Sequence, residues 1–532
     1  MIPNLSTIDS IIIISYILIV LFIGFYFRNK SKSSEEYFLA GRSIGWIAIG
    51  ASLFATNISS EHFIGLAGTG SKSGLAVGHF EWLACLMLLL LGWVFTPFYL
   101  KSGVFTMPEF VEKRYNSASR YYLSFISIIG YVLTKISIAL YAGGILLNAV
   151  VGWDMVTAAV VIVLITGIYT VMGGLSAVIY TDLVQTVILI GGSIALTLIG
   201  LDKAGGWNNL VANTPVDFWS MFKPLSDPDF PWTGIIFGAP IIGIWYWCTD
   251  QYIVQRVLSA KNLSNAQSGT ILAGFLKILP VFILILPGII AFYISDGTVS
   301  GDRTYAWLVT NLLPSGLKGL VVAGLLAALM SSLSAMFNST STLLTIDIYK
   351  KIKPDADEKS TVAFGRIATG VMVLLGLLWI PFIGILSDDR MYVYLQSVQA
   401  YISPPIAAIF LFGIFWKRVN GKGAMASLIT GLVLGSFRLI IEIQNKIDPL
   451  SNSFLQSIAS INFLHFAIFL FIVSSAVLVL VSLSTAKPTA DKLEGMVYSR
   501  NISVIKDKWR SINIGFSILL LIVLIALWWN FR

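Results

Sequence analysis

Polar and ionisable side chains interrupt an otherwise apolar part of the chain between residues 51 and 82. Four of them are close in sequence: Asn57, Glu61, His62 and Glu81. A charged group at membrane depth costs roughly 2.5–3.5 kcal/mol, so such groups usually mark the path of a solute or an ion. A helix that loses its regularity there also frees backbone carbonyls, which a dehydrated cation requires. The segment therefore predicts a transporter site for a polar solute and a hard cation.

Three polar residues lie in apolar segments that a solute would have to pass. Lys277 is roughly mid-membrane at ~1.5 Å per residue, so it forms either a structural ion pair or a solute contact. Glu81 either accepts two hydroxyl donors or is a carboxylate stabilised at a helix start. Gln396 offers donors and acceptors together, which suits sugar hydroxyls as well as a bond between helices.

Aromatic rings and small hydroxyls supply the remaining candidates. Tyr246 and Trp247 form either an aromatic lid over a pyranose ring or part of an interfacial belt. Ser331 and Ser332 lie on a helix rich in small residues, where they are either hydroxyl ligands for Na⁺ or packing residues. Asp182 lies at a cytoplasmic helix entrance, where it either attracts sodium or caps the helix. The residues alone leave these alternatives open.

The composition predicts an all-α membrane protein. The 532-residue chain is 56% hydrophobic and 12% charged, with a mean hydropathy of +0.83, whereas a soluble chain is nearer one quarter charged. Apolar stretches long enough for a ~30 Å hydrocarbon core recur along the chain, and they predict fourteen transmembrane helices. The first of these lacks a basic segment before it, so we expect a retained helix rather than a cleaved signal.

Basic residues indicate the orientation of these helices. Of the 35 Lys and Arg residues, 24 lie in the six connections that face the same side when the N-terminus is outside, and only 8 lie in the opposite connections and tail. Basic connections mark the cytoplasmic side. We therefore expect both termini outside and read the net charge of +8 as an orientation signal, not as a nucleic-acid footprint.

Interrupted helices at matching positions suggest an internal repeat. Glycine and proline interrupt the second apolar segment around Ala55–Gly70 and the seventh around Gly238–Gly243. A five-helix unit repeated in tandem must be inverted in the membrane, because five is odd, and such interruptions mark the site of inverted-repeat carriers. We divide the chain into 1–44 (first helix and cytoplasmic loop), 45–200 (repeat one), 201–232 (extracellular loop), 233–420 (repeat two) and 421–532 (peripheral helices with a cytoplasmic linker, 486–510).

Redox and enzymatic classes find little support. Cys85 and Cys248 lie in separate apolar segments without metal-ligand spacing, so both are expected to be core thiols. The three histidines are scattered, whereas bis-histidine haem ligation needs pairs on facing helices. Phosphate-loop and nucleophile-elbow motifs do not occur in the sequence. We therefore do not expect an enzyme.

Several long strings resemble the sodium/glucose cotransporter family, within the solute:sodium symporters. They are EEYFLAGRS at 35–43, NISSEHFIGLAGTG at 57–70, FEW at 80–82, GGLSAVIYTDLVQT at 173–186, WYWCTDQYIVQR at 245–256, NSTSTLLTIDIY at 338–349 and SPPIAAIFLFGIFWKRVN at 403–420. The resemblance covers about 35–485 and implies a LeuT-like fold of inverted five-helix repeats with peripheral helices. It also implies Na⁺-driven uptake of a sugar or related polyol.

The resemblance assigns roles to individual positions. The implied sugar contacts are Asn57, His62, Glu81, Lys277 and Gln396, with Tyr246 as the inner gate and Trp247 lining the pocket. The implied sodium ligands are the carbonyls of Ala55, Ile58 and Ala328 and the hydroxyls of Ser331 and Ser332. A second sodium would use Asp182 and Ser334. Two positions depart from the family: Ala335 lacks one hydroxyl of that second site, and Gly243 stands where other members have Asn or Thr.

We accordingly expect a sodium-coupled symporter that imports a monosaccharide of the glucose or galactose type by alternating access. It would lie in the plasma (inner) membrane, in contact with lipid, and would bind no nucleic acid. Two alternatives stay open: a symporter for another polar solute, such as myo-inositol or an organic anion, and a solute-gated sensor that does not transport stoichiometrically. Lys277 would suit an anion, but Glu81 argues for a neutral polyol. The oligomeric state does not follow from the residues.

Overall fold

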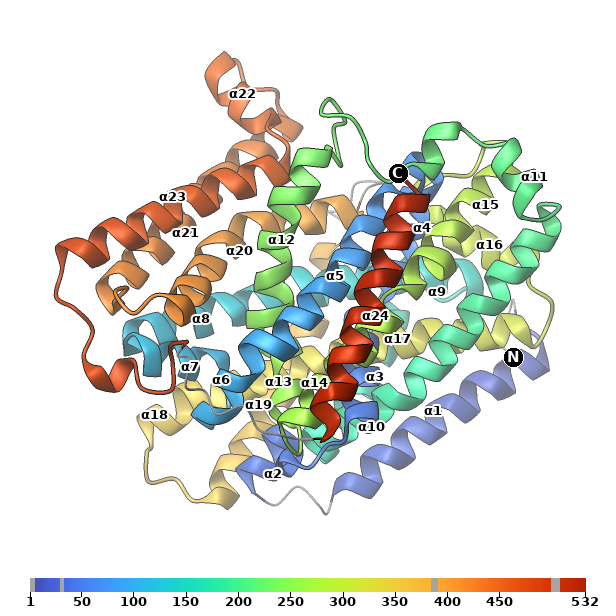
Figure 1. Ribbon diagram of the computed structural model, residues 1–532. Coiled ribbons are helices and arrows are strands. Elements are labelled where there is room, and N and C mark those ends of the chain that lie inside the picture. The colour runs from blue at the N-terminus through green and yellow to red at the C-terminus, as the bar shows by residue number, and fades with distance from the viewer. Residues whose placement is uncertain (1–4, 29–32, 384–390, 499–507) are drawn as a thin grey trace.

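The computed structural model describes residues 5–28, 33–383, 391–498 and 508–532, and it is built from helices (Figure 1). The first part of the chain forms α1 Thr7–Phe27, α2 Ser34–Leu39, α3 Trp46–Asn57, α4 Ser60–Ser73, α5 His79–Leu90, α6 Thr96–Ser102, α7 Met107–Arg114, α8 Ser117–Gly130, α9 Ser137–Val151 and α10 Met155–Lys203. The rest forms α11 Trp207–Ala212, α12 Ala239–Gly243, α13 Gln251–Leu258, α14 Leu263–Leu276, α15 Leu286–Ile294, α16 Thr304–Leu312, α17 Leu317–Thr342, α18 Lys350–Ile352, α19 Glu358–Ile383, α20 Met391–Phe415, α21 Gly421–Ile447, α22 Ser453–Ser460, α23 Phe463–Ser484 and α24 Lys508–Asn530.

Length and apolar composition identify a multi-pass membrane protein. Among the described residues, nine helical runs can cross a membrane, and three shorter apolar helices accompany them. Fewer separate runs are found than the fourteen expected, partly because two expected spans are fused in α10, where Gly174 (φ 58°, ψ −153°) makes a kink. The finer division into fourteen spans therefore remains a prediction. Part of the expected linker, 499–507, lies outside the described residues.

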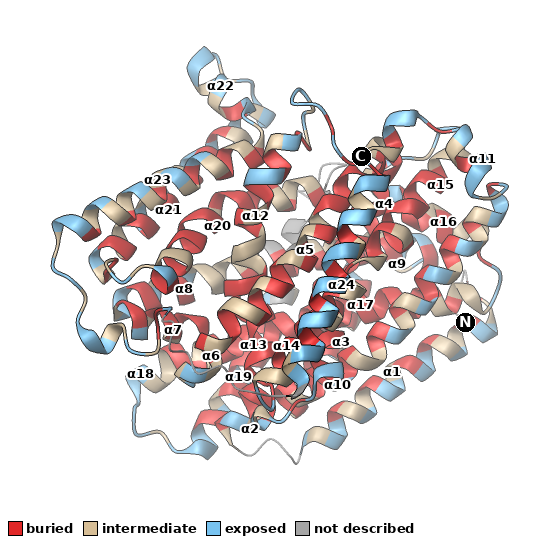
Figure 2. Ribbon diagram, viewed as in Figure 1, coloured by how far each residue is buried: buried red, intermediate tan, exposed pale blue. Residues whose placement is uncertain are grey.

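Burial separates a central helix from peripheral ones (Figure 2). In the run that contains α17, 94% of the apolar window is buried, against 22% in α1 and in α24. Apolar side chains on these outer helices, such as Phe22 and Trp529, are exposed and suit contact with lipid. The central position of α17 brings its serines against the broken helix at α3 and α4.

The first helix break lies where the sequence predicted it. After α3 ends at Asn57, Ile58 (φ −76°, ψ 107°) and Ser59 (φ −119°, ψ −178°) are extended, and α4 begins at Ser60. Residues in this conformation leave the helical hydrogen-bond ladder. The break therefore frees backbone groups in the middle of a buried segment.

The second break lies later in the chain than predicted. The backbone stays helical through Gly243 and through a π-helical turn, Ile244–Thr249, and the extended residue is Asp250 (φ −76°, ψ 128°). Pro240 follows the π-helical turn Gly234–Gly238, and such turns are where a helix accommodates a proline ring. The interruption consequently places an acidic side chain, rather than glycines, at the start of α13.

Glycines allow α4 and α15 to pack with their backbones in contact. A Cβ atom at Gly288 would lie 2.0 Å from the carbonyl oxygen of Ala67, and one at Gly70 would lie 2.6 Å from the carbonyl oxygen of Ile285. No other residue type fits such an approach without moving the backbone. This close packing fixes the position of α4, which carries the first candidate site residues.

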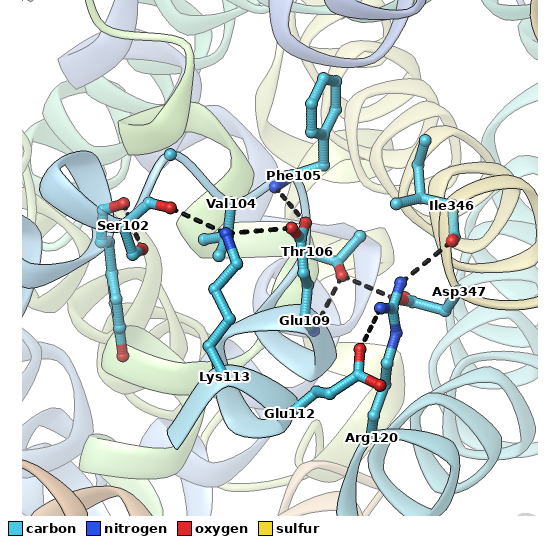
Figure 3. Close-up of polar contacts among 12 residues, drawn as sticks. Ser102, Val104, Phe105, Thr106, Glu109, Glu112, Lys113, Arg120, Ile346 and Asp347 are labelled. Carbon is cyan, nitrogen blue, oxygen red and sulfur yellow. Dashed lines mark hydrogen bonds and ion pairs between the residues drawn. The ribbon is translucent and has the colours of Figure 1, made fainter. Parts of the chain in front are cut away.

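An ion network joins the helices at the end of the molecule that holds α18 (Figure 3). Arg120, from α8, donates to Asp347 from Nε at 2.7 Å and to Glu112, from α7, at 2.5 Å. Lys351, in α18, donates to Glu112 at 3.0 Å. Burial alone would raise the pKa of the Glu112 carboxyl, but hydrogen bonds from Ser117, Arg120 and Lys351 outweigh it and lower that pKa to about 2.

Candidate functional site

A cavity lies beside the two broken helices, and all of the sequence-predicted solute contacts line it. Its lining includes all seven of them: Asn57, His62, Glu81, Tyr246, Trp247, Lys277 and Gln396. They come from α3, α4, α5, the π-helical turn before Asp250, the end of α14, and α20. Residues up to 339 positions apart in the chain thus converge on one space (Asn57 to Gln396).

Lys277 is the centre of one wall of this cavity. Its ammonium group donates to the carboxylate of Glu81 and, at 2.5 Å, to the side-chain oxygen of Asn57. Its Nζ also lies 5.6 Å from the ring centroid of Trp247. Lys277 and Glu81 are almost completely buried, at 1% and 2% exposure, so each provides the other's charge compensation. The lysine is therefore a paired group that also lines the pocket, and the wall carries no free positive charge.

His62 is held in one orientation by the helix break. The backbone amide of Ser59 donates to its Nδ1 at 3.3 Å, which makes that nitrogen the acceptor and leaves the proton on Nε2. Nε2 lies 3.9 Å from the Glu81 carboxylate, and the ring packs edge-on against Tyr392, with centroids 5.7 Å apart. The histidine thus presents a directed N–H group to the cavity.

Aromatic side chains close the cavity beside Asp250. Tyr246 accepts a hydrogen bond from the amide of Asn57 at 2.8 Å, and its hydroxyl contacts that of Tyr252. The ammonium of Lys135 pairs with Asp250 at 2.6 Å and lies 3.9 Å from the ring centroid of Tyr252. The sequence shows no evident partner for Lys135, because Asp250 is far along the chain. The available signal was the acidic side chain of Asp250 at the end of an interrupted aromatic segment.

Two of the expected sodium ligands, Ser331 and Ser332, lie on α17, and Ser332 contacts the end of α3. Ala55, Ile58, Ala328, Ser331 and Ser332 are all at most 1% exposed. The Ser332 hydroxyl donates to the backbone oxygen of Thr56 at 3.2 Å, which puts it beside the carbonyls that precede the break. Oxygen atoms from one broken helix and one facing helix are the kind of shell that a hard cation accepts.

Asp182 lies next to this shell. It accepts hydrogen bonds from Ser331 at 2.6 Å, Ser52 at 2.5 Å and Thr56 at 3.2 Å, and Arg256 is 3.9 Å away. Ser334 is different, because its hydroxyl donates to the backbone oxygen of Ser331 at 2.9 Å. The structure therefore brings Asp182 together with Ser331 and leaves Ser334 bonded within its own helix.

The space beside Gly243 is occupied by the side chain of Met87. It lines the cavity, and a Cβ atom there would lie 2.8 Å from Cγ of Met87, which lines the same cavity. Met87 thus takes the space in which a longer side chain at position 243 would lie. The Asn or Thr of other family members at this position would require Met87 to move.

Comparison with protein families gives one match that covers most of the chain. Residues 37–431 match the model of the sodium:solute symporter family. The chain is 41% identical to sheep sodium/glucose cotransporter 1 over 529 residues, which cover 91% of this chain and 79% of that protein. It is also 39% identical to the human sodium/myo-inositol cotransporter over 552 residues, covering 94% and 77% respectively.

Solved structures show the same fold. A substrate-bound, outward-open Na⁺-coupled sialic acid symporter superposes with a TM-score of 0.78 at 23% identity, covering 91% of this chain and 99% of that one. Mhp1, a transporter of the nucleobase-cation-symport-1 family, superposes with a TM-score of 0.56 at 14% identity, covering 88% and 98%. At these identities the likeness concerns the fold alone.

Proposed function

Because the chain belongs to the sodium:solute symporter family and has its LeuT-like fold, we propose that it imports a monosaccharide of the glucose or galactose type. The family is one of transporters, so the chain is a Na⁺-coupled symporter and not an enzyme. Sodium is a co-transported ion in this family, so it is a second substrate rather than a cofactor. The identity of the solute is the part that we propose.

The pairing of Lys277 with Glu81 is the observation that supports a neutral solute. An anion would need a free cation in the pocket, but the Lys277 ammonium is already shared between Glu81 and Asn57. A sugar hydroxyl, in contrast, can donate to the Glu81 carboxylate and accept from His62 Nε2–H without changing the net charge. A site built on such groups discriminates strongly against solutes that leave them unpaired.

Sodium would bind at the α3 break and hold the two helices that form it. Ser331 and Ser332 in α17 lie against the end of α3, so an ion bound there joins α17 to the helix that carries Asn57. Each charge that crosses 100 mV supplies about 2.3 kcal/mol, before any concentration gradient. Asp182 would take part in a second, weaker sodium site, which gives two ions per solute.

Alternating access would act on the two five-helix repeats. We assign 45–200 and 233–420 to these inverted repeats, within fourteen spans whose termini both lie outside in the plasma membrane. In Figure 1, α2 and α18 lie at one end of the molecule and α11 and α22 at the other, which supports this orientation. Tyr246 and Trp247 would separate the bound solute from the cytoplasm.

The relatives support a second candidate solute. The sodium/myo-inositol cotransporter is 39% identical to the chain, close to the 41% of the glucose cotransporter. Myo-inositol presents hydroxyls around the ring and is also neutral, so it would satisfy the same groups. The two solutes therefore belong in one experiment.

Uptake by proteoliposomes with an inward Na⁺ gradient tests the proposal. The panel consists of radiolabelled D-glucose, D-galactose, myo-inositol and an organic anion, with K⁺ replacing Na⁺ as the control. We expect Na⁺-dependent accumulation of a neutral hydroxylated ring, and preferred uptake of the anion would overturn the proposal. Counterflow of labelled solute separates a carrier from a sensor, because a sensor binds the solute without exchanging it.

A further inference from the structure

The cavity contains an acid that the proposed sugar contacts do not use. Glu61 is the second residue of α4 and lines the same space as Glu81 and Lys277. It is 6% exposed, and its Oε2 atom has no hydrogen-bond partner within the part of the chain that the structure describes. A buried polar atom without a partner is costly, so such an atom facing a binding cavity points to a ligand that completes it.

The cations of the cavity are committed to other acids. Lys277 is paired with Glu81, and Lys135 is paired with Asp250 at 2.6 Å. Glu61 interacts with the Lys135 ammonium and the nearby Ser59 hydroxyl. It also lies in the first turn of α4. The positive end of the helix dipole favours a carboxylate there. Glu61 therefore has no ion-pair partner of its own among the described residues, and its Oε2 atom stays open to a ligand.

The open Oε2 atom of Glu61 selects the chemistry of its ligand. It can accept a hydrogen bond, and a solute hydroxyl can donate that bond. Glu61 interacts electrostatically with Lys135 and Tyr252, which line the same cavity, whereas Glu81 is bound to Lys277. A solute that reaches both acids must therefore carry hydroxyls at two separate positions of its ring.

We propose that Glu61 is a second recognition point, which accepts a hydrogen bond from a solute hydroxyl other than the one bound by Glu81. The residue would determine specificity for rings with hydroxyls at two separated positions. This inference rests on the proposed function, since it concerns the solute of the same site. It adds a contact that the family resemblance did not assign.

Single-deoxy analogues test the contact directly. Binding of D-glucose, myo-inositol and their single-deoxy analogues is measured on the purified full-length protein in Na⁺, for the wild type, Glu61→Gln and Glu61→Ala. Glu35→Gln is the matched control, because it makes the same change at a residue paired with Arg42 on the surface. We expect at least tenfold weaker binding of the parent solute to Glu61→Ala and unchanged binding to Glu35→Gln.

The pattern across the analogues is decisive. Removal of one particular hydroxyl should weaken binding to the wild type at least tenfold but have little effect on Glu61→Ala, while removal of the others should weaken binding to both proteins equally. Equal losses for every analogue in both proteins would overturn the inference, as would a changed Na⁺ dependence with an unchanged analogue pattern. Glu61→Gln, which keeps the size of the side chain, gives the same comparison if Glu61→Ala does not fold. Failure of the wild type to bind any hydroxylated ring would instead refute the proposed function.

Discussion

The hydroxyl of Ser331 donates a hydrogen bond to the carboxylate of Asp182 at 2.6 Å. This bond places the two expected sodium sites side by side, although Ser331 was assigned to one and Asp182 to the other. A hydroxyl whose proton is held by a carboxylate keeps its lone pairs for a cation. Asp182 would therefore orient a proposed ligand of the first sodium even without binding an ion itself.

Asp182→Asn should reduce the number of coupled sodium ions. An amide removes the negative charge that a second ion needs, so we expect two Na⁺ per solute in the wild type and one in the variant. Reversal potentials measured with known solute and Na⁺ gradients give this ratio. Asp217→Asn, on an exposed side chain, serves as the control. A one-to-one ratio in the wild type would show that no second ion is coupled, and Ala335→Ser then tests whether a further hydroxyl creates that coupling.

Ser332→Ala should impair the use of sodium more than recognition of the solute. It deletes a hydroxyl beside the Thr56 carbonyl, and Na⁺ has few alternative ligands in so buried a place. We expect a higher half-saturating Na⁺ concentration for uptake. Ser341→Ala is the matched control on the same helix, because its hydroxyl donates to the Gly365 carbonyl instead. If the dependence of uptake on Na⁺ and Li⁺ is unchanged, Ser332 contributes only to helix packing.

Gln396→Ala should weaken solute binding at least tenfold with the fold intact. Gln396 is half-buried in the cavity wall, and removal of one hydrogen-bond partner costs about 1–3 kcal/mol. It is a cleaner test than Glu81→Ala, which should also weaken binding at least tenfold but leaves the Lys277 ammonium without its carboxylate. Isothermal titration with the solute in Na⁺ measures both. Wild-type affinity in both variants would contradict the assigned site.

Lys135→Met should destabilise the protein by roughly 3–5 kcal/mol, because it leaves the buried Asp250 carboxylate without its cation. The double variant Lys135→Met/Asp250→Asn removes both charges and should recover part of that loss. Melting temperatures of the wild type, Lys135→Met, Asp250→Asn and the double variant in detergent give the comparison. A double variant that is as unstable as the sum of the two single changes would mean that the pair contributes no coupling energy.

Glu112→Gln should lower stability in a pH-dependent way. The folded-state pKa of about 2 is below the usual 4.5, so the carboxylate contributes stability above pH 4.5 and loses it as the pH falls towards 2. The difference in melting temperature between wild type and variant should therefore be constant from pH 7.5 to 5.5 and shrink at pH 4 and pH 3. A difference that grows on acidification would contradict the ion network of Figure 3.

The sequence predicts which residues form the site better than it predicts which of them contact one another. Asn57, His62 and Lys277 could be found because polar groups are rare in apolar segments and each has to serve a purpose there. The pairing of Lys135 with Asp250 could not, since it depends on how two distant helices pack. The position of the second break was also missed, because Gly and Pro lower the cost of a bend, whereas tertiary packing decides where it occurs.

The backbone contact between α4 and α15 has a mechanical consequence. Gly288 and Gly70 place the backbones of the two helices in direct contact, so we expect α4 to move together with α15. Because α15 continues the helical run that begins with α14, the unit formed by α4, α14 and α15 carries both Glu61 and Lys277. A rocking motion would then keep Glu61 and Lys277 at a constant separation, while the distance from both groups to Gln396, on α20, would change.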